Sequence, residues 1–153
     1  MTRTKEDVIA HLIVFIIGLI IVLVVTSCDT AHAEPSEIVL QTIAMESASE
    51  PIEGQIMVAK TIQNRAERGN ISPESVVLKR KQYSCWNDPK WAKAWLDRNY
   101  TPNVRQRASK AWEMALGESV NYTHYHTIDI LPYWAVGHKG ERVGKHIFYG
   151  GIK

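Results

Sequence analysis

Residues 45–65 read MESASEPIEGQIMVAKTIQNR, and this stretch places three carboxylates at the junction of two expected helices. Pro51 divides the stretch, because the residue before a proline disfavours the α region while proline itself suits a helix's first turn. We therefore expect one helix over 34–49 and a second over 51–68, with Gly69 as its stop. The apolar residues at helical spacing on the second helix are Ile56, Ala59, Ile62 and Ala66.

The rest of the chain reads as shorter helices followed by strands. Three dipeptides combine a helix-capping residue with a proline that suits the first turn of a helix: Ser72-Pro73, Asp88-Pro89 and Thr101-Pro102. β-branched and aromatic residues predict strands near the C-terminus, and Lys139-Gly140 suggests a turn between them. The expected helices cover 72–78, 88–98 and 101–117, and the expected strands cover 122–130 and 143–149. The fold class is therefore α+β, a mainly helical single domain with a small C-terminal antiparallel sheet.

Residues 1–33 read as an export segment separate from the domain at 34–153. Arg3 and Lys5 precede an apolar run over 12–25, which ends near the cleavage pattern Ala31-His32-Ala33. A cleaved signal peptide is the first interpretation; lipidation at Cys28 and retention as a membrane anchor are the alternatives. All three place the domain outside the cytoplasm, in the periplasm or cell envelope, and the last two attach it to the membrane.

Composition narrows the class of protein. The chain has 153 residues, 45% hydrophobic and 22% charged, which excludes a disordered chain. A net charge of +2 suits an anionic wall polymer and is too weak to indicate nucleic acid as a partner. If Cys28 is removed or lipidated, Cys85 has no intrachain partner, and a free cysteine is more often a small buried residue than a nucleophile.

Glu46 is the strongest candidate for a general acid. It follows Ile43 and Met45 near the end of the first helix, where the negative end of the helix dipole favours a neutral carboxyl. A glutamic acid in an apolar cleft can hold the proton that the leaving oxygen of a sugar needs. Glu50 and Glu53 lie at the start of the second helix, where the dipole instead stabilises the anion.

Hydrolysis of a glycosidic bond ordinarily requires a second carboxylate on the far side of the sugar. Asp88 and Asp129 are the candidates for this partner, although each also suits a helix cap or a solvated strand end. A lytic transglycosylase needs no such partner, because the 6-hydroxyl of muramic acid attacks and one carboxyl serves as acid and then as base.

The other candidate residues are histidines, aromatic residues and an amide. His124-Tyr125-His126 puts two imidazoles on one strand face, which is a spacing found in zinc sites. His138 and His146 could complete such a set of zinc ligands, although no H-E-x-x-H motif is present. Tyr83 and Trp86 either line a sugar cleft or pin a loop to the core. We expect Asn64 to donate a hydrogen bond within the core or the cleft, and Arg65 to bind a carboxylate through two hydrogen bonds.

Several motifs in order resemble the SleB/CwlJ-type cell-wall hydrolases, over roughly 38–149. These motifs are Glu46-x-x-x-Glu50-Pro51-x-Glu53-Gly54-Gln55, Asn64-Arg65, Gln82-Tyr83-Ser84-Cys85-Trp86, Thr123-His124-Tyr125-His126, Pro132-x-Trp134 and Gly144-x-His146-x-Phe148-Tyr149. The resemblance implies a lysozyme-like domain acting on peptidoglycan glycan strands. The family's spore-cortex members are lytic transglycosylases with one essential glutamate, which carries over to Glu46.

One departure affects the family's Gly-Glu-Ala-Arg-Gly-Glu run, which here reads Met45-Glu46-Ser47-Ala48-Ser49-Glu50. Both acids remain, and both glycines and the arginine are replaced. We expect a peptidoglycan-cleaving enzyme, for wall remodelling or phage-type lysis, with Glu46 as the catalytic residue and no metal or other cofactor. A metal-dependent amidase or peptidase and a non-catalytic wall-binding lysis accessory protein are the alternatives. The expected substrate-binding residues are Glu50, Asn64, Tyr83, Trp86, His124, Tyr125 and His126.

Overall fold

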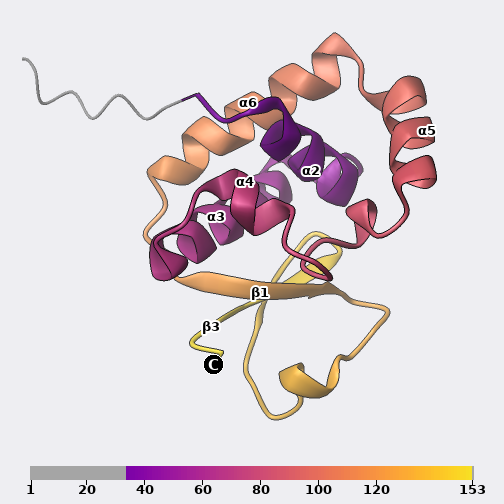
Figure 1. The fold of residues 1–153 in the computed structure, drawn as a ribbon. Coiled ribbons are helices and arrows are strands. Elements are labelled where there is room, and N and C mark those ends of the chain that lie inside the picture. The colour runs from indigo at the N-terminus through magenta and orange to yellow at the C-terminus, as the bar shows by residue number, and fades with distance from the viewer. Residues whose placement is uncertain (1–33, 153) are drawn as a thin grey trace, which may run out of the picture. The chain divides into compact units, whose positions relative to one another are not determined.

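Helix α3 (Ile52–Gly69) packs against three other helices and the first strand of the sheet (Figure 1). The computed structural model describes residues 34–152, and the expected export segment at 1–33 lies outside these residues. In chain order the other elements are α2 (Glu37–Ser47), α4 (Pro73–Val77), the 3-10 helix η1 (Ser84–Trp86), α5 (Pro89–Asn99), α6 (Pro102–Leu116), β1 (Tyr122–Thr127), the 3-10 helix η2 (Tyr133–Ala135), β2 (Glu141–Val143) and β3 (His146–Gly150).

The predicted helices are confirmed, although the first runs over Glu37–Ser47 rather than 34–49. Side chains cap the later helices α5 and α6. The Asp88 side chain accepts from the backbone N–H groups of Lys90 and Trp91, and the Thr101 side chain accepts from that of Val104. At the end of α3 the stop is one residue later than expected. Asn70, not Gly69, adopts the left-handed conformation with φ of 47°, which asparagine tolerates better than most residues.

The sheet differs from the prediction in its second half. Where one strand is expected over 143–149, the structure has a hairpin of β2 and β3 that turns at Gly144-Lys145. The turn expected at Lys139-Gly140, between the two predicted strands, is irregular chain that leads into β2. Gly144 has φ of +60°, a conformation that glycine adopts without a steric penalty. All pairs are antiparallel, and β3 lies between β1 and β2. A bulge interrupts the β1–β3 pairing between Tyr122 and His124.

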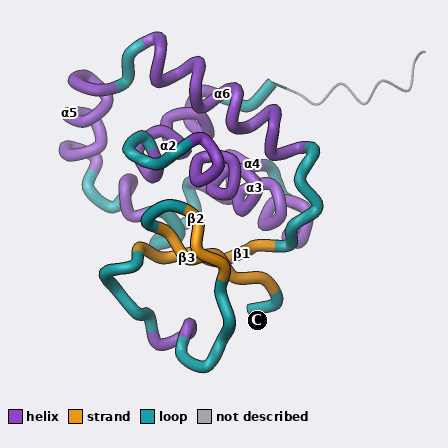
Figure 2. The backbone as a smooth tube through the Cα atoms, turned by 180° about the vertical axis from the view of Figure 1, so that it is seen from behind, coloured by secondary structure: helices purple, strands orange, loops and turns teal. Residues whose placement is uncertain are grey.

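The hydrophobic core lies among α2, α3 and α6, and the sheet packs on one side of α3 (Figures 1 and 2). The four predicted apolar residues of α3 are all buried. Between β1 and β2 the chain makes a long excursion that includes η2, which Figure 2 shows extending away from the helices. None of the helices described here combines the length and hydrophobicity that a transmembrane span requires.

Candidate active site

Glu46 lies in the last turn of α2, half-buried, at the wall of a cleft of about 350 Å³. Three donors converge on its carboxyl group. The Ser84 hydroxyl and the Cys85 backbone N–H lie 3.4 and 3.3 Å from Oε1, and the Tyr125 hydroxyl donates to Oε2 over 3.1 Å. The carboxyl therefore meets polar groups from η1 and β1, rather than the apolar wall expected from the sequence.

Among the described residues that line this cleft, Glu46 is the only acid. Asp88 caps α5 and Asp129 follows β1, and neither lines the cleft. The other lining residues are Arg65, Lys81, Gln82, Ser84, Asn87, Tyr125, His126, Thr127, Ile130, Pro132, Trp134 and His146. Apolar and aromatic side chains from the excursion between β1 and β2 thus line the same cleft as polar side chains from the segment around η1.

Tyr125 connects the carboxyl to the sheet. Its ring packs edge-on against His146, with ring centroids 5.2 Å apart, and also lies against Phe148. Burial, and then the charge of Glu46, raises the pKa of Tyr125 well above its ordinary value. The hydroxyl therefore remains protonated and continues to donate to Glu46 throughout the neutral range.

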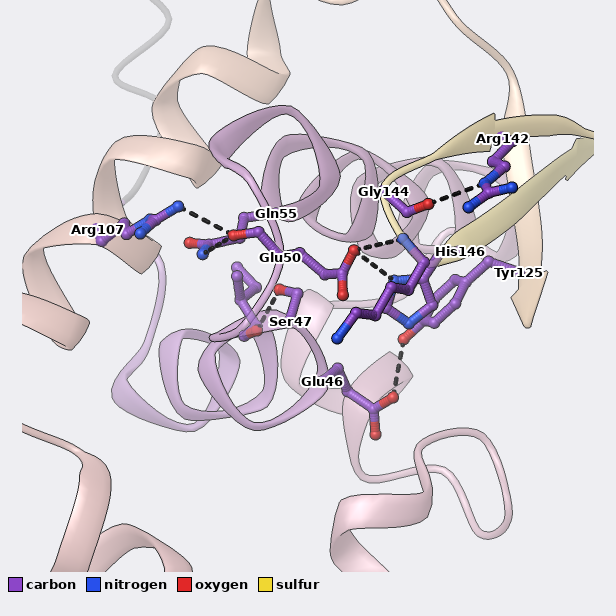
Figure 3. Close-up of polar contacts among 11 residues, drawn as sticks. Glu46, Ser47, Glu50, Gln55, Arg107, Tyr125, Arg142, Gly144 and His146 are labelled. Carbon is purple, nitrogen blue, oxygen red and sulfur yellow. Dashed lines mark hydrogen bonds and ion pairs between the residues drawn. The ribbon is translucent and has the colours of Figure 1, made fainter. Parts of the chain in front are cut away.

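Glu50 lies close to Glu46 in sequence but occupies a different environment (Figure 3). Its side chain is buried, and Oε2 accepts the backbone N–H of Lys145 over 2.7 Å. The Glu50 carbonyl accepts from the side chains of Gln55 and Arg107. Glu50 thus joins the α2–α3 junction to the β2–β3 turn, and it does not line the cleft.

Three other residues predicted to bind substrate have contacts within the protein. Asn64 is buried and donates to the backbone carbonyls of Val120 and Tyr122, which fixes the entry into β1. Tyr83 lies in the core, and the Trp86 indole N–H donates to the Thr42 hydroxyl over 2.9 Å, which holds η1 against α2. None of the three lines the cleft, and the two aromatic residues fit the alternative of a loop pinned to the core.

Arg65 and Cys85 lie beside the candidate acid. The Arg65 side chain donates to the Thr123 carbonyl over 2.6 Å and lies 5.4 Å from the centre of the Tyr83 ring. Contrary to the expectation for Arg65, none of the ion pairs between described residues joins it to a carboxylate. Cys85 is buried and, within the described residues, forms no disulfide. Burial, followed by the nearby charge of Glu46, raises the pKa of the Cys85 thiol, which opposes a nucleophilic role.

The histidines of β1 share one face of the strand, as the spacing predicts. Both rings lie against Trp134, with centroids 5.1 Å from His124 and 5.7 Å from His126. The two ring nitrogens of His126 already contact the Thr127 carbonyl and the Tyr149 hydroxyl. Within residues 34–152 no group of three or more His, Cys, Asp or Glu side chains is arranged to hold a metal ion.

Sequence reasoning missed several residues of the cleft. Lys81, Asn87 and Ile130 belong to no motif, and only the three-dimensional arrangement brings them to Glu46. Five other lining residues do belong to the quoted motifs, namely Gln82, Ser84, Pro132, Trp134 and His146. The motifs therefore indicate more of the cleft than the predicted substrate-binding residues include.

The fold and cleft can be compared with known proteins. A family model described as Cell Wall Hydrolase matches residues 49–149, and the chain therefore belongs to this family of peptidoglycan hydrolases. The crystal structure of the catalytic domain of the Bacillus cereus SleB protein is similar to this chain at 25% identity, with a TM-score of 0.55. The alignment covers 74% of this chain and 91% of that domain. No match is found among curated proteins. The family and fold predicted from the sequence are confirmed.

Proposed function

We propose that the chain is a lytic transglycosylase that cleaves peptidoglycan between N-acetylmuramic acid and N-acetylglucosamine. Glu46 protonates the bridging oxygen as the bond to C1 of the muramic acid breaks. The 6-hydroxyl of the same muramic acid attacks C1, and its proton passes to the Glu46 carboxylate. The products are a 1,6-anhydro end and a free N-acetylglucosamine end, and no water is consumed.

The observation that supports this mechanism is that the described lining of the cleft contains a single acid. A hydrolase that inverts or retains configuration through two carboxylates requires a second one on the far side of the sugar. Glu46 is the only acid among the described lining residues, which favours a mechanism in which one group serves as both acid and base. The family match begins at residue 49, so the role of Glu46 is supported by the cleft geometry and not by that match.

Digestion of purified sacculi by wild type and Glu46→Gln tests the proposal. General acid–base catalysis is typically worth at least about 100-fold, so we expect Glu46→Gln to lose at least that factor in rate. Glu53→Gln is the matched control, because Glu53 is exposed in the first turn of α3 and should retain wild-type activity. Circular dichroism of each variant checks that the fold is intact.

Mass spectrometry of the soluble products identifies the bond. Anhydro-muropeptides that depend on Glu46 support the proposal. Reducing muramic ends would instead indicate a water-consuming muramidase, and free stem peptides would indicate an amidase. Undiminished release by Glu46→Gln would overturn the role of Glu46, and binding to sacculi without any release would indicate a wall-binding accessory protein.

A further inference from the structure

A second hollow, of about 310 Å³, lies next to the active-site cleft. It shares Arg65 and Gln82 with the cleft, so the two hollows are neighbours on the same part of the protein. We call it the cationic pocket. Its lining residues are Arg65, Arg68, Gly69, Ile71, Val76, Lys79, Gln82, Thr123 and His124, and none of these described residues is acidic.

The positive charges of the cationic pocket have no acidic partner within the described chain. None of the ion pairs between described residues involves Arg65, Arg68 or Lys79. The Arg65 Nη1 is buried without a hydrogen-bond partner, and Arg68 has only a long contact of 3.4 Å with the Thr123 hydroxyl. Guanidinium groups that lack an acidic partner beside a cleft are suited to a ligand anion.

The pKa of His124 is affected by the same positive charges. Its pKa is lowered, first by burial and then by the charges of Arg65 and Arg68. The imidazole is therefore neutral at neutral pH, and the positive charge of the pocket comes from Arg65, Arg68 and Lys79. The other lining side chains include the aliphatic Ile71 and Val76, which supply an apolar contact beside the charged groups.

We propose that the cationic pocket binds a carboxylate of the stem peptide carried by the glycan strand in the cleft. This inference rests on the proposed function, because it requires a glycan strand at Glu46. The peptide is attached to the lactyl group of muramic acid, on the sugar whose bond would be cleaved. Its acidic residues thus extend from the strand close to the scissile bond. Arginine pairs with planar carboxylates through two parallel hydrogen bonds, and alanyl methyl groups suit the aliphatic side.

The test uses the full chain and two forms of one substrate. Sacculi without teichoic acid provide peptide-bearing strands, and the same sacculi treated with an amidase provide bare glycan strands. We expect Arg68→Gln/Lys79→Gln to lower kcat/KM about tenfold on peptide-bearing strands, mainly through KM, and to leave bare strands unaffected. Lys90→Gln/Lys110→Gln removes the same charge from helices that line neither hollow, and should behave as wild type.

An equal loss on both strands, or no loss on either, would overturn the inference. Binding to the inactive Glu46→Gln protein separates this inference from the proposed function. A soluble stem tripeptide should bind Glu46→Gln and lose its binding when Arg68 and Lys79 are also replaced. If inorganic phosphate or a fully amidated peptide binds as tightly, the assignment to a carboxylate is overturned. If Glu46→Gln still cleaves sacculi, the proposed function fails while the peptide titration still decides the pocket.

Discussion

Tyr125 and Glu46 meet at the candidate active-site cleft, where the tyrosine hydroxyl donates to Glu46 Oε2 over 3.1 Å. The two residues are 79 positions apart, and they come together because α3 holds the start of β1. Asn64 and Arg65, at successive positions of α3, donate to three backbone carbonyls at residues 120–123. The orientation of the candidate acid thus depends on contacts between α3 and the sheet.

Tyr125→Phe tests this dependence. The substitution removes one donor from the carboxyl while it keeps the ring that packs on His146 and Phe148. A hydrogen bond to a charged group contributes about 1.5–3 kcal/mol, so we expect kcat to fall about 10- to 100-fold. Because Tyr125 acts through Glu46 as a positioning residue, KM should change little. Steady-state release of muropeptides from sacculi measures both constants.

Tyr122→Phe is the matched control for Tyr125→Phe. Tyr122 lies on the same strand, but its hydroxyl bonds to Glu141 and does not face the cleft. Its removal should leave kcat at the wild-type value. A change in KM alone for Tyr125→Phe, or equal losses in both variants, would contradict the positioning role.

Local sequence signals were sufficient for the α-helices and for the position of Glu46 at the end of the first one. Proline after a capping side chain marks the start of α4, α5 and α6, and a glutamate at the end of α2 is the carboxyl that reaches the cleft. The replaced residues of the acidic run do not line the cleft. Met45 packs against the core, and Ala48 and Ser49 are exposed in the turn that follows α2.

Long-range contacts determined what the sequence did not predict. Glu50, Asn64 and Trp86 have the polar and aromatic chemistry of ligand-binding residues, but their partners lie on other elements. No local pattern distinguishes a buried hydrogen bond to a distant backbone group from a contact with substrate. The β2–β3 hairpin was not predicted for the same reason, because its turn at Gly144 lies against Glu50, a residue distant in sequence.

The close approach of Gly144 to Glu50 predicts an unusually large effect of a single methyl group. A Cβ at position 144 would lie 2.1 Å from Glu50 Oε2, and the φ of +60° is also unfavourable for alanine. We expect Gly144→Ala to lower the free energy of unfolding by about 2–4 kcal/mol. Urea unfolding followed by circular dichroism measures this change.

Gly137→Ala is the control for Gly144→Ala. Gly137 also has a positive φ, of +80°, but nothing lies within 4 Å of the Cβ that alanine would add. This variant should lose only the backbone component, about 1 kcal/mol. Equal losses in the two variants would show that the Glu50 contact does not constrain the turn.

Asn64 was expected to bind substrate, and its contacts instead predict an effect on stability. Asn64→Ala leaves the partly buried carbonyls of Val120 and Tyr122 without their donor, which should cost about 1–3 kcal/mol. Asn99→Ala removes an exposed contact with the Trp95 carbonyl and should cost less than about 0.5 kcal/mol. If Asn64→Ala unfolds at the wild-type urea concentration but has a higher KM for sacculi, Asn64 acts on substrate.

His146 predicts how stability depends on pH. Its ring is buried beside Tyr125, with Nδ1 3.8 Å from Glu50 Oε2. Burial lowers the pKa of His146, and this effect exceeds the opposing influence of the Glu50 and Glu46 charges, while His126 adds to the lowering. The contact with Glu50 therefore joins a carboxylate to a neutral imidazole at neutral pH.

The direction of the pH dependence follows from the number of protons that each state binds. Below its ordinary pKa of 6.5, the histidine of the unfolded chain takes up a proton while the folded His146 remains neutral. The unfolded state then binds more protons, so the contribution of His146 to stability is present above pH 6.5 and declines as the pH falls. Urea unfolding at pH 7.5 and 5.5 should show this decline in wild type and a smaller one in His146→Gln. His138→Gln, which changes an exposed ring, should keep the wild-type difference, and an equal decline in His146→Gln would exclude His146 as its source.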